Sequence, residues 1–191
     1  MQLLEERIRR DGKVYDGDVL KVDSFLNHQI DVGFLCTLGK EFYRLYRDSG
    51  VNKILTVEAS GIGVACLTAQ YFGCPVVFAK KSKTSNIGTD VWSAAAHSYT
   101  HGTDHTLVVS KSYLGAGDRV LILDDFLANG CAAKAMLALC AQAGAQVVGA
   151  GIVIEKAYQK GGDDLRALGL RVESLARVAS MSPTEGIRFC D

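Results

Sequence analysis

The feature that most constrains the fold is an apolar run that ends in two adjacent acids. Residues 120–123 are Val-Leu-Ile-Leu, Asp124 and Asp125 follow, and a short loop leads through Gly130 into an alanine-rich segment. This pattern is typical of a buried parallel strand followed by a helix. In open α/β sheets, anionic ligands bind at the carboxyl end of such a strand, close to the next helix N-terminus. The acids need solvent, hydrogen bonds or a cation, and the vicinal hydroxyls of a sugar are one natural partner.

The rest of the chain alternates between strand-like and helix-like segments. We expect strands at 53–57, 75–79, 119–123, 146–154 and 171–175. We expect helices at about 3–11, 31–45, 64–72, 131–143 and 163–168, with Asp31 as the N-cap of the second. This alternation predicts right-handed βαβ crossovers and an α/β fold, a Rossmann-like parallel sheet flanked by helices on both faces.

Two segments interrupt the alternation. Residues 13–30 have no sustained periodicity, and we expect them to be extended and partly irregular. Residues 80–106 are rich in Ser, Thr, Gly, Asn and His and include Lys80, Lys81 and Lys83. Loops this long inside a domain are usually functional or disordered. We therefore predict a long flexible loop, partly a β-ribbon.

Composition limits the function classes. The chain has 191 residues, 48% of them apolar, and its 21 basic and 21 acidic residues cancel. These values predict a single domain with no global field for nucleic acid or an anionic membrane. The charged N-terminus lacks the apolar core of a signal peptide, and no apolar run approaches the roughly 20 residues of a membrane span, so we expect a cytoplasmic protein. The six cysteines form no CxxC pair, and only Cys131 falls on the proposed ligand loop.

The loop after the acids is suited to phosphate. Ala128, Asn129 and Gly130 are small enough to let backbone N–H groups approach an anion, and the following helix adds its positive end. The loop is neither a P-loop nor a GxGxxG turn. Taken alone, the acids also fit a simple acidic patch at a strand end.

Residues 120–132 resemble the phosphoribosyl-pyrophosphate (PRPP) motif of type I phosphoribosyltransferases, an apolar strand with two acids and a small phosphate-binding loop. Three further blocks, 21–31, 151–158 and 171–177, are similar to bacterial xanthine phosphoribosyltransferases in the same order. The resemblance therefore covers essentially the whole chain.

The resemblance implies one phosphoribosyltransferase domain over residues 1–191. Its core would cover about 36–178. A small hood would comprise about 1–35 together with the C-terminal segment, and the flexible loop would be 80–106.

The resemblance also implies roles for the PRPP-binding residues. Asp124 and Asp125 match the acids that hold the ribose 2′- and 3′-hydroxyls. The remaining matches are the 5′-phosphate loop, Ala128, Asn129, Gly130, Cys131 and Ala132, and the pyrophosphate loop, Ala59, Ser60 and Gly61, which in this family often contains an unusual cis peptide. Lys81 lies among the basic residues that the family keeps for pyrophosphate. Without the resemblance, the 59–61 segment fits a plain βα turn and the lysines a solvated basic run.

The purine site is expected elsewhere in the chain. Lys156 matches a family lysine that contacts the base, and an ammonium group, which only donates, suits a 6-oxo acceptor. Leu20 and Asn27 match hood positions that touch the base in the xanthine enzymes. Alternatively, Lys156 caps a strand end beside Glu155. Tyr158 fits base stacking and a core or interface role equally.

One departure from the superfamily concerns the proton on purine N7. Hypoxanthine-guanine enzymes carry an acid at the position of Ala128, and adenine enzymes do not. Asn129 replaces the usual loop hydroxyl, so no side-chain base is evident near N7.

The resemblance as a whole implies a salvage enzyme that converts xanthine and PRPP to xanthosine 5′-monophosphate and pyrophosphate. Mg²⁺ would be carried by PRPP rather than held directly by the protein, and the protein would be a homodimer. An adenine or hypoxanthine-guanine enzyme remains an alternative. A PRPP-sensing transcriptional regulator is another, although the chain leaves little room for a DNA-binding element.

Overall fold

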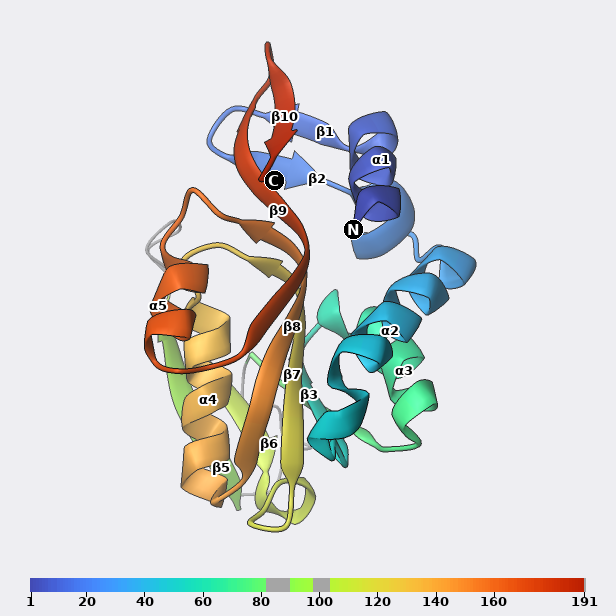
Figure 1. Ribbon diagram of the computed structural model, residues 1–191. Helices are drawn as coiled ribbons and strands as arrows, with labels where there is room; N and C mark the ends of the chain where they lie inside the picture. Colours follow the sequence, from blue (N-terminus) through green and yellow to red (C-terminus); the bar gives the residue numbers. More distant parts are fainter. Residues whose placement is uncertain (82–89, 98–103, 191) are drawn as a thin grey trace.

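The computed structural model describes residues 1–81, 90–97 and 104–190 and centres on a six-stranded sheet (Figure 1). The strand order is β10-β9-β8-β7-β3-β4. The strands are β3 (Lys53–Val57), β4 (Val76–Ala79), β7 (Arg119–Leu127), β8 (Gln146–Lys156), β9 (Val172–Ser182) and β10 (Gly186–Phe189). All neighbours are parallel except β10, which pairs antiparallel with β9. The predicted α/β fold with a mostly parallel sheet is confirmed, and β10 is an element that the sequence analysis missed.

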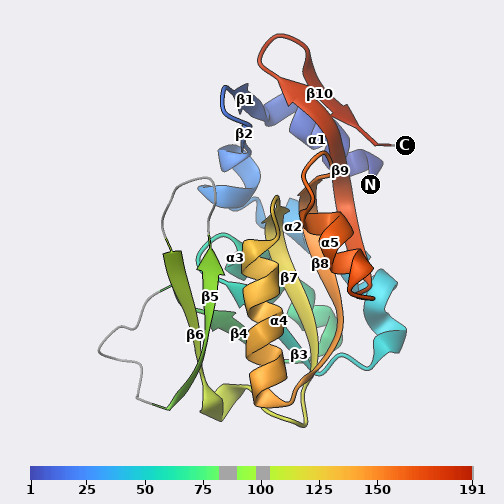
Figure 2. The same cartoon turned by 90° about the vertical axis from the view of Figure 1, so that its left-hand side faces the viewer.

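Helices cover both faces of this sheet, as predicted. They are α1 (Gln2–Asp11), α2 (Val32–Tyr46), α3 (Gly61–Phe72), α4 (Cys131–Ala143) and α5 (Gly161–Ala167). Helices α2 and α3 lie on one face, and α4 and α5 lie on the other (Figures 1 and 2). The side chain of Asp31 caps α2 as expected, because its Oδ1 accepts from the amide of Phe34 at 3.1 Å.

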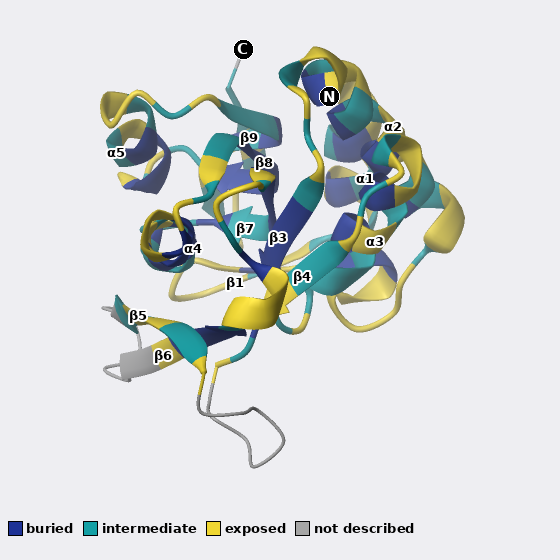
Figure 3. Ribbon diagram, turned by 90° about the horizontal axis from the view of Figure 1, so that it is seen from below, coloured by how far each residue is buried: buried dark blue, intermediate teal, exposed yellow. Residues whose placement is uncertain are grey.

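Strand β7 separates two hydrophobic cores. Leu121 and Leu123 belong to the core beneath α2 and α3, whereas Val120 and Ile122 belong to the core beneath α4. This is the two-residue alternation of a strand that is buried on both faces. Figure 3 shows dark blue, buried residues both on the central strands and on the helices that cover them.

Two element boundaries near the acids differ from the prediction. Strand β7 does not end at Leu123 but continues to Leu127, because its pairing with β8 runs on to the register Leu127–Glu155. Asp124 and Asp125 therefore lie inside the strand and not after it. Helix α3 begins at Gly61, three residues before the predicted start, so Gly61 belongs to the first helical turn.

The segment 13–30 is more regular than expected. It contains an antiparallel hairpin, β1 (Lys13–Tyr15) with β2 (Val19–Lys21), and a π-helical turn at Asp23–Asn27. The hairpin and α1 pack against the far ends of β9 and β10 (Figure 1).

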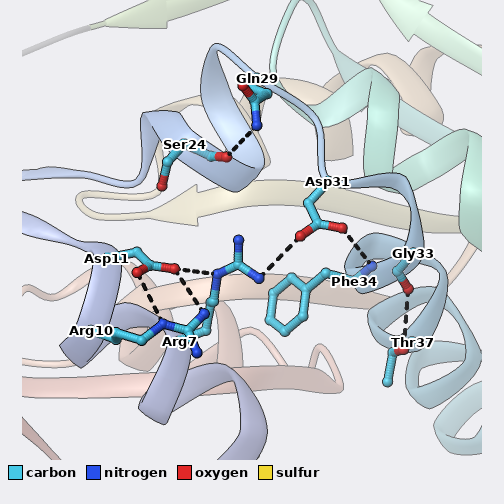
Figure 4. Close-up of polar contacts among 9 residues, drawn as sticks. All are labelled: Arg7, Arg10, Asp11, Ser24, Gln29, Asp31, Gly33, Phe34 and Thr37. Carbon is cyan, nitrogen blue, oxygen red and sulfur yellow. Dashed lines mark hydrogen bonds and ion pairs between the residues drawn. The ribbon is translucent and has the colours of Figure 1, made fainter.

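Arg7 joins this N-terminal segment to α2. Its guanidinium group lies 3.0 Å from the carboxylate of Asp31 and 2.5 Å from that of Asp11 (Figure 4). The same group lies over the rings of Phe25 and Phe34, about 5 Å from each centroid. One side chain thus ties α1, the π-helical turn and the N-cap of α2 together.

The predicted long loop at 80–106 is partly a β-ribbon, as anticipated. Strands β5 (Val91–His97) and β6 (Asp104–Ser110) pair antiparallel beside α4 (Figure 2). Residues 82–89 and 98–103 lie outside the described residues. Within the part of the chain that the structure describes, no helix has both the length and the apolar character needed to cross a membrane.

We predict that Gly39→Ala lowers the free energy of unfolding by about 1–3 kcal/mol. A Cβ at this position in α2 would lie 2.8 Å from the carbonyl oxygen of Leu67 in α3, so the two helices would have to separate. Urea unfolding measures the change. Gly33→Ala is the matched control in the same helix, since its Cβ would meet only Asp31 at 3.9 Å. The control should gain about 0.5–1 kcal/mol from helix propensity, and an equal loss in both variants would contradict the packing argument.

Candidate active site

A cavity of about 240 Å³ opens where β7 meets α4. Its wall includes Asp124 of β7, Lys81 and all of residues 128–132, the predicted phosphate loop. These residues come from two distant parts of the sequence, Lys81 and the stretch 124–132. The structure therefore brings together most of the residues assigned to PRPP. A larger cavity, about 620 Å³, lies beside β4 and contains none of them.

Asp124 is the electrostatic centre of this cavity. Its side chain is only 5% exposed, and its Oδ1 accepts a hydrogen bond of 3.0 Å from the amide of Asp125. Burial, reinforced by the negative charge of Asp125, raises the pKa of Asp124 well above its ordinary value. The charge of Lys81 acts in the opposite direction. A ligand that donates hydrogen bonds to this carboxylate would stabilise its charged form.

The phosphate loop ends at the N-terminus of α4. Gly130 adopts the left-handed conformation, with φ 76°, directly before the helix. The amide of Lys134 is bonded to the carbonyl of Gly130 at 2.9 Å. The amides of the first turn, residues 131–133, precede any intrahelical acceptor, so they are free to face the cavity. Such amides, together with the helix dipole, are the groups that bind an anion at a helix N-terminus.

The pyrophosphate loop lies next to the acid pair. A Cβ on Gly61 would lie 3.3 Å from Oδ1 of Asp124 and would overlap the hydroxyl of Thr56, so only glycine fits. Thr56 is fully buried, and its hydroxyl has no hydrogen-bond partner among the described residues. The peptide bond between Glu58 and Ala59 is cis, as the resemblance implied. Ala59 and Ser60 thus sit at the turn between β3 and α3, beside the cavity.

Glu58 connects this turn to the lysine segment. Its Oε1 accepts from the amide of Lys81 at 2.7 Å, and its own amide donates to the carbonyl of Ala79 at 3.1 Å. Lys81 consequently lines the Asp124 cavity, whereas Lys80 lines the larger cavity beside β4. Lys83 lies outside the described residues. The structure thus separates two lysines that the sequence left equivalent.

The predicted purine residues lie beside the cavity rather than in its wall. Lys156 ends β8, the strand next to β7, and its ammonium group donates to the backbone carbonyl of Asp18 at the tip of the β1–β2 hairpin. Burial lowers the pKa of Lys156, and the charge of Asp18 opposes that shift. Lys156 thus bonds to the hairpin from the end of the strand, a contact that also fits the alternative of a lysine that caps a strand end beside Glu155.

The hood residues differ from one another in exposure. Leu20 on β2 is buried in the core with α1 and α2, and Asn27 is exposed at the end of the π-helical turn. Tyr158, two residues after Lys156, is exposed, and desolvation together with the charge of Asp18 raises its pKa to about 12. None of these side chains lines the cavity at Asp124.

Sequence reasoning missed a buried ion pair behind the phosphate loop. Glu155 is 1% exposed, and both of its oxygens accept from Arg166 of α5, at 2.8 and 2.7 Å. At the start of α5, Gly161 packs against the loop backbone and Gly162 packs against the ion pair. The sequence signal that could have pointed to it is that glycine pair, directly before the helix expected at 163–168.

Comparison with known proteins places this site in a family. Residues 38–172 match the phosphoribosyl transferase domain. The xanthine phosphoribosyltransferase of Lachnoclostridium phytofermentans is 54% identical over 97% of this chain and 96% of its own length. That of Bifidobacterium longum subsp. infantis is 51% identical over 97% of each chain. The chain belongs to the xanthine phosphoribosyltransferase family.

Solved structures that resemble this member of the family are adenine phosphoribosyltransferases. The Trypanosoma brucei enzyme, in complex with AMP, pyrophosphate and ribose-5-phosphate, aligns with a TM-score of 0.77 at 17% identity, over 91% of this chain and 79% of that one. The Rhodothermus marinus enzyme aligns with a TM-score of 0.74 at 20% identity, over 93% and 99%. At this identity the likeness establishes the fold that the family shares.

We predict that Asp124→Asn makes the protein more stable at neutral pH. The folded-state pKa of Asp124 lies above the unfolded value, so the folded state binds the extra proton and stability falls as the pH rises from about 3.9 through the raised pKa. Asparagine removes that loss. Thermal unfolding across this pH range measures it, with Asp118→Asn as control, since that change breaks the 2.8 Å ion pair with Lys53 and should destabilise. A lower melting temperature for Asp124→Asn than for the wild type at neutral pH would contradict the assignment.

Proposed function

We propose that this protein transfers the phosphoribosyl group of PRPP to N9 of xanthine, releasing xanthosine 5′-monophosphate and pyrophosphate. The observation that carries the proposal is the single cavity at the end of β7, in which a buried carboxylate, a lysine and a helix N-terminus meet. These are the groups that ribose hydroxyls, pyrophosphate and a 5′-phosphate require. The family's xanthine enzymes, matched over nearly the whole chain, support the choice of base.

The cavity divides the sugar phosphate into three parts. Asp124 and Asp125 accept hydrogen bonds from the ribose 2′- and 3′-hydroxyls. Backbone amides of residues 128–132, with the dipole of α4, bind the 5′-phosphate. The 59–61 turn and Lys81 bind pyrophosphate at the opposite end, so C1′ is held between the two anion sites.

Catalysis then depends on alignment and charge stabilisation. The bond from C1′ to pyrophosphate breaks while positive charge develops on the ribose, and the N9–C1′ bond forms as the base nitrogen attacks. Lys81 stabilises negative charge on the leaving group, and the buried Asp124 fixes the sugar ring and faces the developing positive charge. With Ala128 in the loop, we assign no side chain to the proton on N7.

Magnesium is proposed as a companion of PRPP. Among residues 1–81, 90–97 and 104–190, no three His, Cys, Asp or Glu side chains gather in a way that could hold a metal ion. The acid pair fits an ion that takes most of its ligands from pyrophosphate, ribose and water, as Mg²⁺ does. Bound there, it would neutralise charge on the leaving pyrophosphate.

Base recognition is proposed at the edge of the cavity. The ammonium of Lys156 already donates to a carbonyl, that of Asp18, and a 6-oxo group of the purine would be an acceptor of the same kind. A 6-amino group would not. Leu20 and Asn27, on the segment that packs over this edge, complete the proposed purine site.

The remaining parts of the proposal concern organisation. Residues 1–191 form one domain, with a core at about 36–178. The hood of about 1–35 with the C-terminal segment covers the base, and the loop at 80–106 closes over pyrophosphate and excludes water. We also propose a homodimer, which analytical ultracentrifugation tests.

A panel of four purine bases tests the function. With radiolabelled xanthine, guanine, hypoxanthine or adenine, PRPP and Mg²⁺, nucleotide formation should be fastest with xanthine and slowest with adenine. Faster conversion of adenine would overturn the base assignment. Absence of nucleotide with all four bases, combined with retention of a DNA probe, would favour the regulator instead.

We predict that Lys156→Gln raises KM for xanthine by about 10- to 100-fold, the loss of a charged hydrogen bond worth about 1.5–3 kcal/mol. KM for PRPP should change far less, because Lys156 lies outside the cavity wall. Initial rates with each substrate varied in turn provide both constants. Lys40→Gln, on the exposed face of α2, is the control and should change neither. An equal rise in both constants for Lys156→Gln would make Lys156 structural.

A further inference from the structure

The buried ion pair between β8 and α5 has no part in the chemistry described above. Glu155 accepts from Arg166 through both oxygens, from Ser174 at 2.5 Å, and lies 3.3 Å from Nε of Arg177. Burial acts to raise the pKa of Glu155, but the hydrogen bonds from Arg166 and Ser174 outweigh it and hold the pKa below its ordinary value. The carboxylate is therefore ionised at neutral pH and fully engaged.

This ion pair fixes the start of α5. A Cβ on Gly162 would overlap Oε1 of Glu155 and lie 2.6 Å from Nη1 of Arg166. The backbone of α5 thus passes directly over the ion pair, with no side chain between them. Leu165, also on α5, is buried with Leu127 and Ala133, the residues that flank the phosphate loop.

The preceding residue, Gly161, touches the phosphate loop itself. Its amide donates to the carbonyl of Ala128 at 3.0 Å. A Cβ on Gly161 would overlap that carbonyl and lie 2.6 Å from the amide nitrogen of Gly130. In return, a Cβ on Gly130 would lie 3.2 Å from Cα of Gly161. The backbones of Gly161 and Gly130 are therefore in contact where α5 packs against the loop.

We propose that Glu155 is a positioning residue for PRPP, which aligns the 5′-phosphate loop through Arg166 and the Gly161–Gly162 pair. The proposal rests on the proposed role of residues 128–132 in binding the 5′-phosphate. Backbone amides bind an anion well only when their directions are fixed in advance. Here the loop packs against α5, and the Glu155–Arg166 ion pair holds α5 in place.

Glu155 and Lys156 are adjacent at the end of β8 but contact different parts of the protein. Glu155 pairs in register with Leu127 on β7, at the root of the phosphate loop, while the adjacent Lys156 reaches the hairpin at Asp18. Successive side chains of a strand point to opposite faces. Glu155 would then support binding of the sugar phosphate, and Lys156 would bind the base. Substitution of one residue should therefore change the KM of one substrate and not of the other.

Kinetics with each substrate varied in turn test the proposal. Glu155→Gln and Gly161→Ala should each raise KM for PRPP by about tenfold or more, since small displacements of binding groups are costly. KM for xanthine should change by less than about threefold, because the base site is supported independently. Calorimetric titration of ribose 5-phosphate should show the same loss of affinity.

Matched controls separate positioning from stability. Asp118→Asn breaks a similarly shielded ion pair at the amino end of β7, and Gly39→Ala overfills a similarly tight glycine between α2 and α3. Both should lower the melting temperature without altering KM for PRPP. Arg166→Lys keeps the charge but loses the bidentate geometry, and it serves as the milder variant if Gly161→Ala does not fold.

A further variant separates the phosphate-loop assignment from the positioning role of Glu155. Cys131→Asp places a negative charge in the first turn of α4, where it favours the helix but repels phosphate. If Cys131→Asp leaves the affinity for ribose 5-phosphate unchanged, the loop assignment fails. If Cys131→Asp weakens that affinity but folded Glu155→Gln and Arg166→Lys leave it intact, or raise both Michaelis constants equally, the positioning role of Glu155 is overturned.

Discussion

The site depends on keeping a carboxylate inside the sheet with no basic side chain of the described residues bonded to it. Asp124 lies in β7 between two hydrophobic cores, accepts a backbone amide from Asp125 and has a raised pKa. Burial of a charge without full compensation costs stability, and proteins keep such groups where a ligand completes their interactions. The surrounding structure follows from this constraint. Gly61 has no Cβ, so that the turn after β3 can approach the acid, and α4 begins close enough to place its positive end over the same cavity.

In the proposed function, different parts of the fold serve the two halves of the reaction. The strand, loop and helix from β7 to α4 would bind the phosphorylated ribose through carboxylates and backbone amides, which do not distinguish one purine from another. Base choice would fall to the end of β8 and to the N-terminal hairpin, where Lys156 meets Asp18. With this division, a loop with alanine at position 128 is compatible with the proposed function.

Much of the fold was predictable from local patterns. Apolar runs identified the central strands, and the capping residue Asp31 identified the start of α2. Tertiary contacts decided the rest. The segment 13–30 lacks periodicity because its hairpin packs on β9 rather than on a helix of its own. Strand β7 outlasts its apolar run because pairing with β8 continues past the acids. Of the site, the residues in the strand and loop motif were found, whereas Glu155 was read only as a neighbour of Lys156. Its partner Arg166 is 11 residues away, and no sequence pattern predicts an ion pair with two hydrogen bonds between a strand and the next helix.

A crystal structure of the protein with xanthosine 5′-monophosphate tests the central claim most directly. We expect the 5′-phosphate on the backbone amides of residues 128–132, the ribose hydroxyls on Asp124 and Asp125, and the 6-oxo group on Lys156. A nucleotide whose phosphate lies away from the N-terminus of α4, or whose ribose hydroxyls point away from the acid pair, would contradict it.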